Sequence, residues 1–148
     1  MMQKIFIDTD IILDLLAERQ PFYENAAALF TLIDRGKILA YTSPVVFANL
    51  HYILSKQLSK KYAIVNLKKL RTLIKIVPVD EKIIDLALES DFTDYEDAIQ
   101  YNAAISAEIS TLITRNIKDC KNPVITVCSP EEYLRMWSSQ NKNWVHQR

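Results

Sequence analysis

The sequence predicts an α/β fold with three layers, in which a five-stranded parallel sheet carries helices on both faces. Short apolar segments alternate along the chain with longer segments of helical periodicity, and this alternation is typical of parallel sheets covered on both sides. The 148 residues are 49% hydrophobic and 24% charged, with a formal net charge of zero, so the chain can bury one substantial core. The only glycine is Gly36, which excludes the glycine-rich phosphate loops of dinucleotide and P-loop enzymes.

The N-terminal part of the chain predicts one strand and two helices. Residues 4–7 form a short apolar run, and a helix beginning near Ile11 follows until Pro21 ends it. A second helix is expected over residues 23–35, because apolar side chains recur there at helical spacing. Gly36 comes directly after this helix, where a left-handed C-terminal cap is needed.

The middle of the chain predicts two strands with two helices between them. Ser43 supplies a cap and Pro44 a first-turn proline for the first of these helices. The second helix is more basic. The expected elements are strands over residues 38–41 and 74–79 and helices over residues 44–58 and 62–73.

The C-terminal part predicts three helices and two strands. Asp80 caps the first helix, and Thr93 with Glu96 is interpreted as a capping box before the second. Ser129 and Glu132 form another capping box at the last helix. The expected elements are helices over residues 81–88, 97–108 and from residue 130 onward, and strands over residues 111–114 and 124–127.

The organisation predicts a single domain over residues 1–140 and a polar tail over residues 141–148. Asp8 and Asp10 interrupt the apolar N-terminus, so neither a signal peptide nor a membrane span is expected. Cys120 and Cys128 are neither a CxxC pair nor a disulfide framework for a domain of this size. We therefore expect reduced thiols and a cytoplasmic location.

Polar and acidic side chains cluster in three segments of the chain. Ligands of parallel α/β sheets bind beyond the carboxyl ends of the strands. Each segment lies at such a strand end or at the start of a helix, so the three can meet at one edge of the sheet. The segments contain Asp8, Asp10 and Asp14; Asp91, Asp94, Glu96 and Asp97; and Asn116 with Asp119.

Several carboxylates at one point repel each other unless cations neutralise them. Ligand sets made only of oxygen favour hard cations such as Mg²⁺ or Mn²⁺, and such an ion polarises a phosphate and activates water. The residues therefore predict a metal-dependent phosphodiesterase or phosphatase. Zero net charge argues against a general basic surface for nucleic acid, but Arg115 and Lys118 beside the last segment are candidates for holding phosphates.

Most of these acids also have a structural interpretation. Asp10 is a possible helix cap. Asp14 lies on the same helix face as Asp10, and its carboxylate can complement the helix dipole. Asp94 and Asp97 have the same alternative in their own helix. Asp8 is harder to explain in this way, because it directly ends an apolar strand.

Four other residues are interpreted as structural. Glu96 is the expected capping-box partner, and Asp91 is expected in a solvated loop. His51 and His146 lack the spacing of a zinc site, and we expect His51 to be a half-buried helix residue.

Four segments in order resemble the motifs of the PIN domain family. Residues 5–14 resemble its opening, in which a polar run with an aspartate ends the first strand, and Asp97-Ala98 resembles its third acidic motif, an Asp-Ala pair that opens a helix. Residues 112–119 resemble the fourth motif. A strand followed by Ser-Pro-Glu-Glu matches the usual ending, so the resemblance spans residues 4–134.

For a small single-domain chain, the resemblance implies a VapC-type toxin: a Mg²⁺- or Mn²⁺-dependent endoribonuclease paired with an antitoxin. It implies catalytic roles for Asp8, Asp97 and Asp119, and metal binding by Asp8, Asp97 and Asp94. We expect accessory roles for Asp10, Asp14, Asn49 and Asn116, and, from the basic side chains themselves, phosphate binding by Arg115 and Lys118. The resemblance also implies a homodimer, for which we expect an apolar patch on the helices near residues 26–33 and 45–54.

The sequence departs from the family pattern at three positions. Asn49 stands where a glutamate is usual, Asn116 stands where the fourth aspartate is usual, and Asp10 replaces an asparagine. These changes leave open a catalytically weak or inactive PIN domain that binds RNA or a partner protein. Residues 8–10 also fit the nucleophile motif of haloacid-dehalogenase-like phosphatases, although the rest of the chain fits that family less well.

Overall fold

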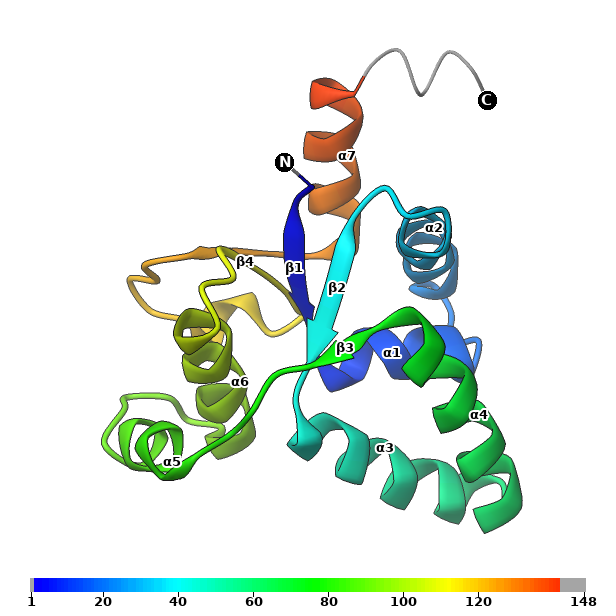
Figure 1. Ribbon diagram of the computed structural model, residues 1–148, viewed down its shortest axis with the longest axis horizontal. Helices are drawn as coiled ribbons and strands as arrows, with labels where there is room; N and C mark the ends of the chain where they lie inside the picture. Colours follow the sequence, from blue (N-terminus) through cyan, green and yellow to red (C-terminus); the bar gives the residue numbers. More distant parts are fainter. Residues whose placement is uncertain (1, 142–148) are drawn as a thin grey trace.

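A computed structural model describes residues 2–141 of the chain. Five parallel strands form one sheet in the order β3-β2-β1-β4-β5 (Figure 1), which confirms the predicted parallel sheet. The strands are β1 (Lys4–Ile7), β2 (Leu39–Thr42), β3 (Lys75–Ile76), β4 (Thr111–Ile113) and β5 (Thr126–Cys128).

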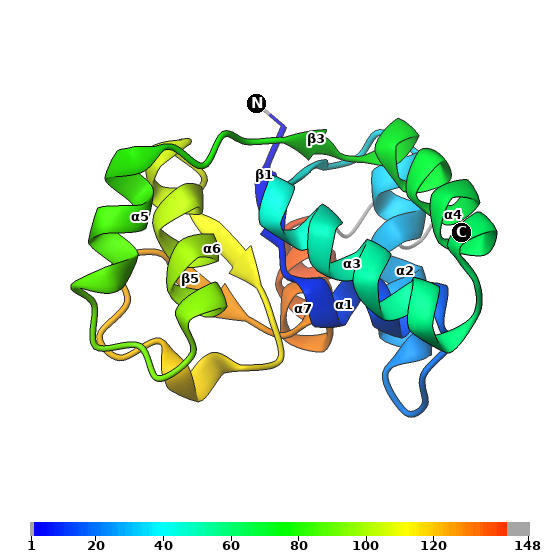
Figure 2. The same cartoon turned by 90° about the horizontal axis from the view of Figure 1, so that it is seen from below.

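Helices cover both faces of this sheet, as the sequence predicts. α5 and α6 pack together on one face, and the other face carries α1 to α4 and α7 (Figure 2). The helices are α1 (Thr9–Leu16), α2 (Tyr23–Asp34), α3 (Pro44–Gln57), α4 (Lys60–Leu73), α5 (Glu81–Leu88), α6 (Tyr95–Ser106) and α7 (Pro130–Gln140).

The central strand β1 is buried on both sides. Its side chains alternate between the two faces, so Ile5 and Ile7 enter the core beneath α1 to α4 and α7, whereas Phe6 enters the core beneath α5 and α6. All three side chains are fully buried. The residue that follows this strand is therefore held at a fixed point between the two layers.

Several local signals act as the sequence predicts. Gly36 has a φ of 71° and its N–H donates to the carbonyl of Ile33, so it forms the left-handed cap of α2. The side chains of Ser43 and Asp80 cap α3 and α5. The capping box of Ser129 with Glu132 is present at the start of α7.

Two local predictions are wrong. The third strand covers only Lys75–Ile76 instead of residues 74–79, because the chain leaves the sheet after pairing briefly with β2. The capping box of Thr93 and Glu96 does not form: α6 begins at Tyr95, and Asp94 is its N-cap. The reason is a competing partner: the backbone N–H and the hydroxyl of Thr93 donate to the carboxylate of Asp119.

The homodimer patch expected near residues 26–33 and 45–54 stays a prediction, and burial limits which residues could form it: Tyr52 of α3 is exposed. Leu29 and Phe30 of α2, and Val46, Leu50 and Leu54 of α3, are buried in the core of the chain itself. The polar tail falls almost wholly outside the described residues, in which Asn141 closes α7. The single domain over residues 1–140 stays a prediction.

The order of the strands places a switch point between β1 and β4. From β1 the chain proceeds outward to β2 and β3, then returns to β4 on the other side of β1 and ends at β5. In such sheets ligands bind beyond the carboxyl ends of the strands at the switch point. Asp8 follows β1 and Thr114 follows β4, so both lie at this position. Within the described residues, no helix is long and apolar enough to cross a membrane.

Candidate active site

Asp8 lies where β1 turns into α1. Its Oδ1 accepts a hydrogen bond from the backbone N–H of Thr9 at 2.8 Å, and its Oδ2 accepts one from the hydroxyl of Thr114 at 2.9 Å. Burial raises the pKa of Asp8 to about 6, although both hydrogen bonds oppose this shift. The strand end thus holds a buried carboxylate that ionises only at a cost.

Asp97, in the first turn of α6, lines the same cavities as Asp8. Its backbone N–H donates to Oδ1 of the N-cap Asp94 at 3.1 Å, and the side-chain amide of Asn116 donates to its Oδ2. Burial, followed by the negative charge of Asp8, raises the pKa of Asp97 to about 7. The two carboxylates are therefore close enough to repel each other.

Asp119, at the end of a short 3₁₀ turn (Ile117–Asp119), anchors the loop that precedes α6. Its carboxylate accepts hydrogen bonds from the Thr93 hydroxyl at 2.5 Å and from the backbone N–H groups of Thr93 and Asp94 at 3.0 and 3.3 Å. Burial opposes its ionisation, but these hydrogen bonds outweigh burial and lower the pKa of Asp119. Asp119 therefore stays charged and fixes the N-cap of α6.

An open acidic cavity of about 310 Å³ lies in front of Asp8 and Asp97. Glu96 and Asn49 belong to its wall, and the Asn49 amide donates to Oε2 of Glu96 at 2.7 Å. Because Glu96 was interpreted as a capping-box partner, it was not assigned to the site from the sequence. Its position directly before Asp97 is the sequence feature that could have indicated this role. The residues around this cavity are Asp8, Thr9, Asp10, Asn49, Tyr52, Ile53, Asp94, Glu96 and Asp97.

Gln100 is a second residue that the sequence reasoning missed. It is buried one turn after Asp97 and lines a small inner cavity with Asp8 and Asp97. Its Oε1 accepts a hydrogen bond from the Ser43 hydroxyl at 2.6 Å. Its Nε2 has no hydrogen-bond partner among the described residues. A free donor thus lies beside the two carboxylates, and no periodicity in the sequence marks it.

Asp14 is buried but does not line the acidic cavity. Its carboxylate forms ion pairs with Arg19 and Arg115, each with a nitrogen–oxygen distance of 3.0 Å. Arg19 also lies 3.9 Å from the carboxylate of Asp10. This shared arginine agrees with the prediction that Asp10 and Asp14 lie on one helix face, and Asp10 reaches the rim of the acidic cavity as well.

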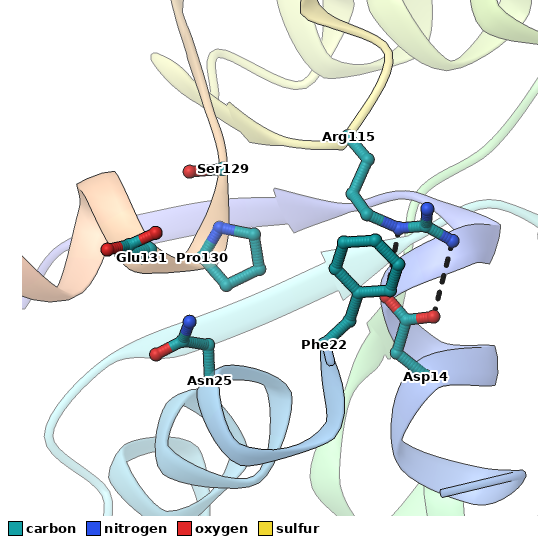
Figure 3. A pocket seen from close by; sticks show the side chains of 7 residues that line it. All are labelled: Asp14, Phe22, Asn25, Arg115, Ser129, Pro130 and Glu131. Atoms are coloured by element: carbon teal, nitrogen blue, oxygen red, sulfur yellow. Dashed lines mark hydrogen bonds and ion pairs between the residues drawn. The ribbon is translucent and has the colours of Figure 1, made fainter. Parts of the chain in front are cut away.

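Arg115 is held in place by its neighbours. The Asp14 carboxylate binds its guanidinium group, which lies 4.0 Å from the centre of the Phe22 ring (Figure 3). Lys118 is exposed on the 3₁₀ turn, and its role in phosphate binding stays a prediction. His51 is half-buried on α3, as expected.

The acidic site suits a hard divalent cation. Its donors are carboxylate and amide oxygens, and the pKa values of Asp8 and Asp97 are raised because burial and like charge are not balanced by an opposite charge. In the described part of the chain, no three acidic, histidine or cysteine side chains converge as a complete metal cage. Mg²⁺ is commonly held by only one or two carboxylates and keeps several waters, so this donor set fits it.

Comparison with known proteins identifies the family. A sequence profile of the PIN domain matches residues 4–118. The chain is 28% identical over 142 residues to ribonuclease VapC1 of Aquifex aeolicus (strain VF5), and the match covers 93% of this chain and 97% of that protein.

Solved structures share the fold. A chain of VapBC2 from Rickettsia felis bound to a DNA fragment from their promoter superposes with a TM-score of 0.63 at 20% identity, covering 86% of this chain and 98% of that one. A chain of a toxin–antitoxin complex from Klebsiella pneumoniae gives a TM-score of 0.64 at 19% identity, covering 85% and 97%. Because the PIN profile covers far more than half of the sequence, the chain belongs to the PIN domain family.

Proposed function

We propose that this protein is a Mg²⁺- or Mn²⁺-dependent endoribonuclease and the toxin of a toxin–antitoxin pair. The observation that carries the proposal is the pair of Asp8 and Asp97, two carboxylates of raised pKa that share a cavity at the switch point of the sheet. The nearby side chains of Arg19 and Arg115 pair with Asp10 and Asp14 instead of with Asp8 or Asp97. A site with this charge accommodates a cation and, through it, a phosphate.

The relatives support the reaction and the pairing. The chain is similar along nearly its whole length to a protein named as a ribonuclease. One structure that shares its fold comes from a toxin–antitoxin complex, and two others come from VapBC assemblies bound to DNA. An antitoxin partner, an RNA substrate and a homodimer follow as parts of the proposal. A cytoplasmic location is part of it too, since Cys120 and Cys128 are free thiols.

The residues take separate roles in this proposal. Asp8 and Asp97 hold the cation, with Asp94 or Glu96 beside them as a further carboxylate. When bound, the cation polarises the phosphate and lowers the pKa of water. Asn116 orients the Asp97 carboxylate by its hydrogen bond.

Asn49 and Asp119 act through other residues. The Asn49 amide holds Glu96 at the cavity wall, so a carboxylate is present even though position 49 lacks one. Asp119 fixes the start of α6 by binding Thr93 and the backbone of Asp94. The two asparagines are thus integrated into the acidic site through hydrogen bonds, which favours an active enzyme over a decayed one.

The test is cleavage of RNA by the purified protein with Mg²⁺, with Mn²⁺ and with a chelator. We expect cleavage only with a divalent cation and its loss in Asp8→Asn. Binding of RNA without cleavage under every condition would support the alternative of an inactive PIN domain. Beryllofluoride trapped on Asp8 would support the phosphatase alternative, which the PIN family match does not favour.

A further inference from the structure

A second cavity, of about 350 Å³, lies between the starts of α2 and α7, next to the buried Asp14 (Figure 3). Its walls come from four separate parts of the chain: α1, the start of α2, the segment after β4 and the start of α7. The fold as a whole therefore forms it. The volume suffices for a flat ring compound of moderate size.

The most distinctive wall of this cavity is a stack of an aromatic ring and a guanidinium group. Phe22 is exposed, and the guanidinium carbon of Arg115 lies 4.0 Å from its ring centre. Asp14 holds Arg115 from a further side by an ion pair and a hydrogen bond. The platform is thus fixed before any ligand binds. Nucleobases stack on aromatic rings and on arginine planes in this manner.

The charges in this cavity favour a base over a phosphate. Asp14 pairs with both Arg115 and Arg19, and Glu131 adds a second negative charge to the cavity wall. A phosphate would meet no net positive charge here. A neutral base, in contrast, would find hydrogen-bond donors and acceptors on Asn25, Ser129 and Glu131.

We propose that this cavity is a nucleobase subsite that holds one base of a single-stranded RNA beside the acidic cavity, an inference that rests on the proposed ribonuclease function. Two links connect the cavities. Arg19 pairs with Asp14 and also lies near Asp10 at the rim of the acidic cavity. Arg115 is followed directly by Asn116, which donates to the acidic site. The four residues from Asp10 to Asp14 advance roughly 6 Å along α1, so one strand can reach both cavities.

Glu131 sets the expected base preference. A carboxylate accepts hydrogen bonds through two oxygens, and guanine presents two adjacent N–H donors on its Watson–Crick edge. We therefore expect guanine to bind more tightly than uracil, and Glu131→Ala to remove the difference.

The experiment titrates 5′-GMP into the 148-residue chain without divalent cation and follows the backbone amide resonances. We expect shifts at Asn25, Arg115 and Glu131, and about tenfold weaker binding in Phe22→Ala, the usual scale for loss of one stacked ring. Leu88→Ala, which removes an exposed apolar side chain that lines neither cavity, serves as the control and should bind as the wild type does.

Three outcomes would overturn the subsite: equal binding of ribose 5-phosphate, shifts confined to the acidic cavity, or unchanged binding in Phe22→Ala. The titration needs neither metal nor cleavage, so it can succeed even if the protein cuts no RNA. Conversely, if RNA is cut and Phe22→Ala leaves the KM for RNA unchanged, the subsite fails and the ribonuclease stands.

Discussion

At the scale of single residues, Asp97 tests the proposed chemistry most directly. Asp97→Asn keeps the shape and the helix position but removes one negative charge from the acidic cavity. Losing about 4 kcal/mol of transition-state stabilisation slows cleavage roughly a thousandfold. Asp91→Asn is the matched control, because Asp91 is exposed and lines neither cavity; its rate should change by less than about threefold. Single-turnover cleavage rates measure both, with circular dichroism to show that each variant folds.

The same carboxylates predict how stability depends on pH. Burial raises the pKa of Asp8 to about 6 and that of Asp97 to about 7, from 3.8. Between about pH 4 and pH 7 the folded protein therefore holds protons that the unfolded chain has released, so the metal-free protein loses stability as the pH rises. Asp97→Asn removes part of this loss and should raise the Tm at pH 8 by a few degrees.

Thermal unfolding of the metal-free wild type and of Asp97→Asn at pH 5 and pH 8 measures this effect. A Tm of the wild type that rises steadily over this range would contradict the raised pKa values. Metal affinity should follow the opposite trend and increase with pH, because the carboxylates must lose their protons to bind the cation.

Residue patterns alone could identify the two acids at the centre of the site but not all of their neighbours. Asp8 follows an apolar strand and Asp97 opens a helix, and these positions are enough to bring them together. Nothing in the spacing shows that Arg115 will turn toward Asp14 instead of a phosphate. Such pairings depend on distant segments, which the sequence does not align.

At the scale of elements, α3 and α6 contact each other at the wall of the acidic cavity through Asn49 and Glu96, so a substitution at position 49 changes the charge of that wall. Asn49→Glu would replace the amide that donates to Glu96 with a second carboxylate. We expect tighter binding of Mg²⁺ or Mn²⁺, since hard cations prefer anionic oxygen. We also expect a lower Tm without metal, because the two glutamates repel each other.

Calorimetric titration with Mn²⁺ and thermal unfolding with and without the metal measure both effects of Asn49→Glu. Asn49→Ala serves as the comparison, because it removes the hydrogen bond to Glu96 without adding charge. If neither the affinity nor the Tm changes in Asn49→Glu, position 49 does not act on the site.

The ends of the helices were predicted best where neighbouring residues alone determine them. Gly36, Ser43 and Ser129 satisfy backbone groups of their own helices, so their effect can be read from a few neighbouring residues. The start of α6 was misplaced because Asp119, more than twenty residues away, binds Thr93. Tertiary contacts override a local signal there.

At the scale of the whole molecule, the parallel sheet followed from the alternation of short apolar strands and helices, because only strands buried on both faces tolerate such composition. The surface of the molecule could not be inferred in the same way. Most apolar side chains of α2 and α3 pack within the chain, although α3 leaves Tyr52 exposed. α4 offers Tyr62, Ile64 and Val65, each exposed by more than 40%.

We therefore expect a homodimer through α4. Light scattering at increasing protein concentration should show twice the mass of one chain, and Val65→Asp should return the protein to the monomer, because a charge in an apolar interface is costly. Leu88→Asp, on α5, is the control. A monomer at every concentration tested would contradict this expectation.

The brevity of the outer strands limits how an extended peptide could bind this protein. β3 and β5, which form the two borders of the sheet, contain two and three residues. A polypeptide that aligned itself along either border would gain very few main-chain hydrogen bonds, so strand addition offers little affinity. An antitoxin would then have to recognise helices and side chains, and self-association into fibrils through these borders is likewise disfavoured.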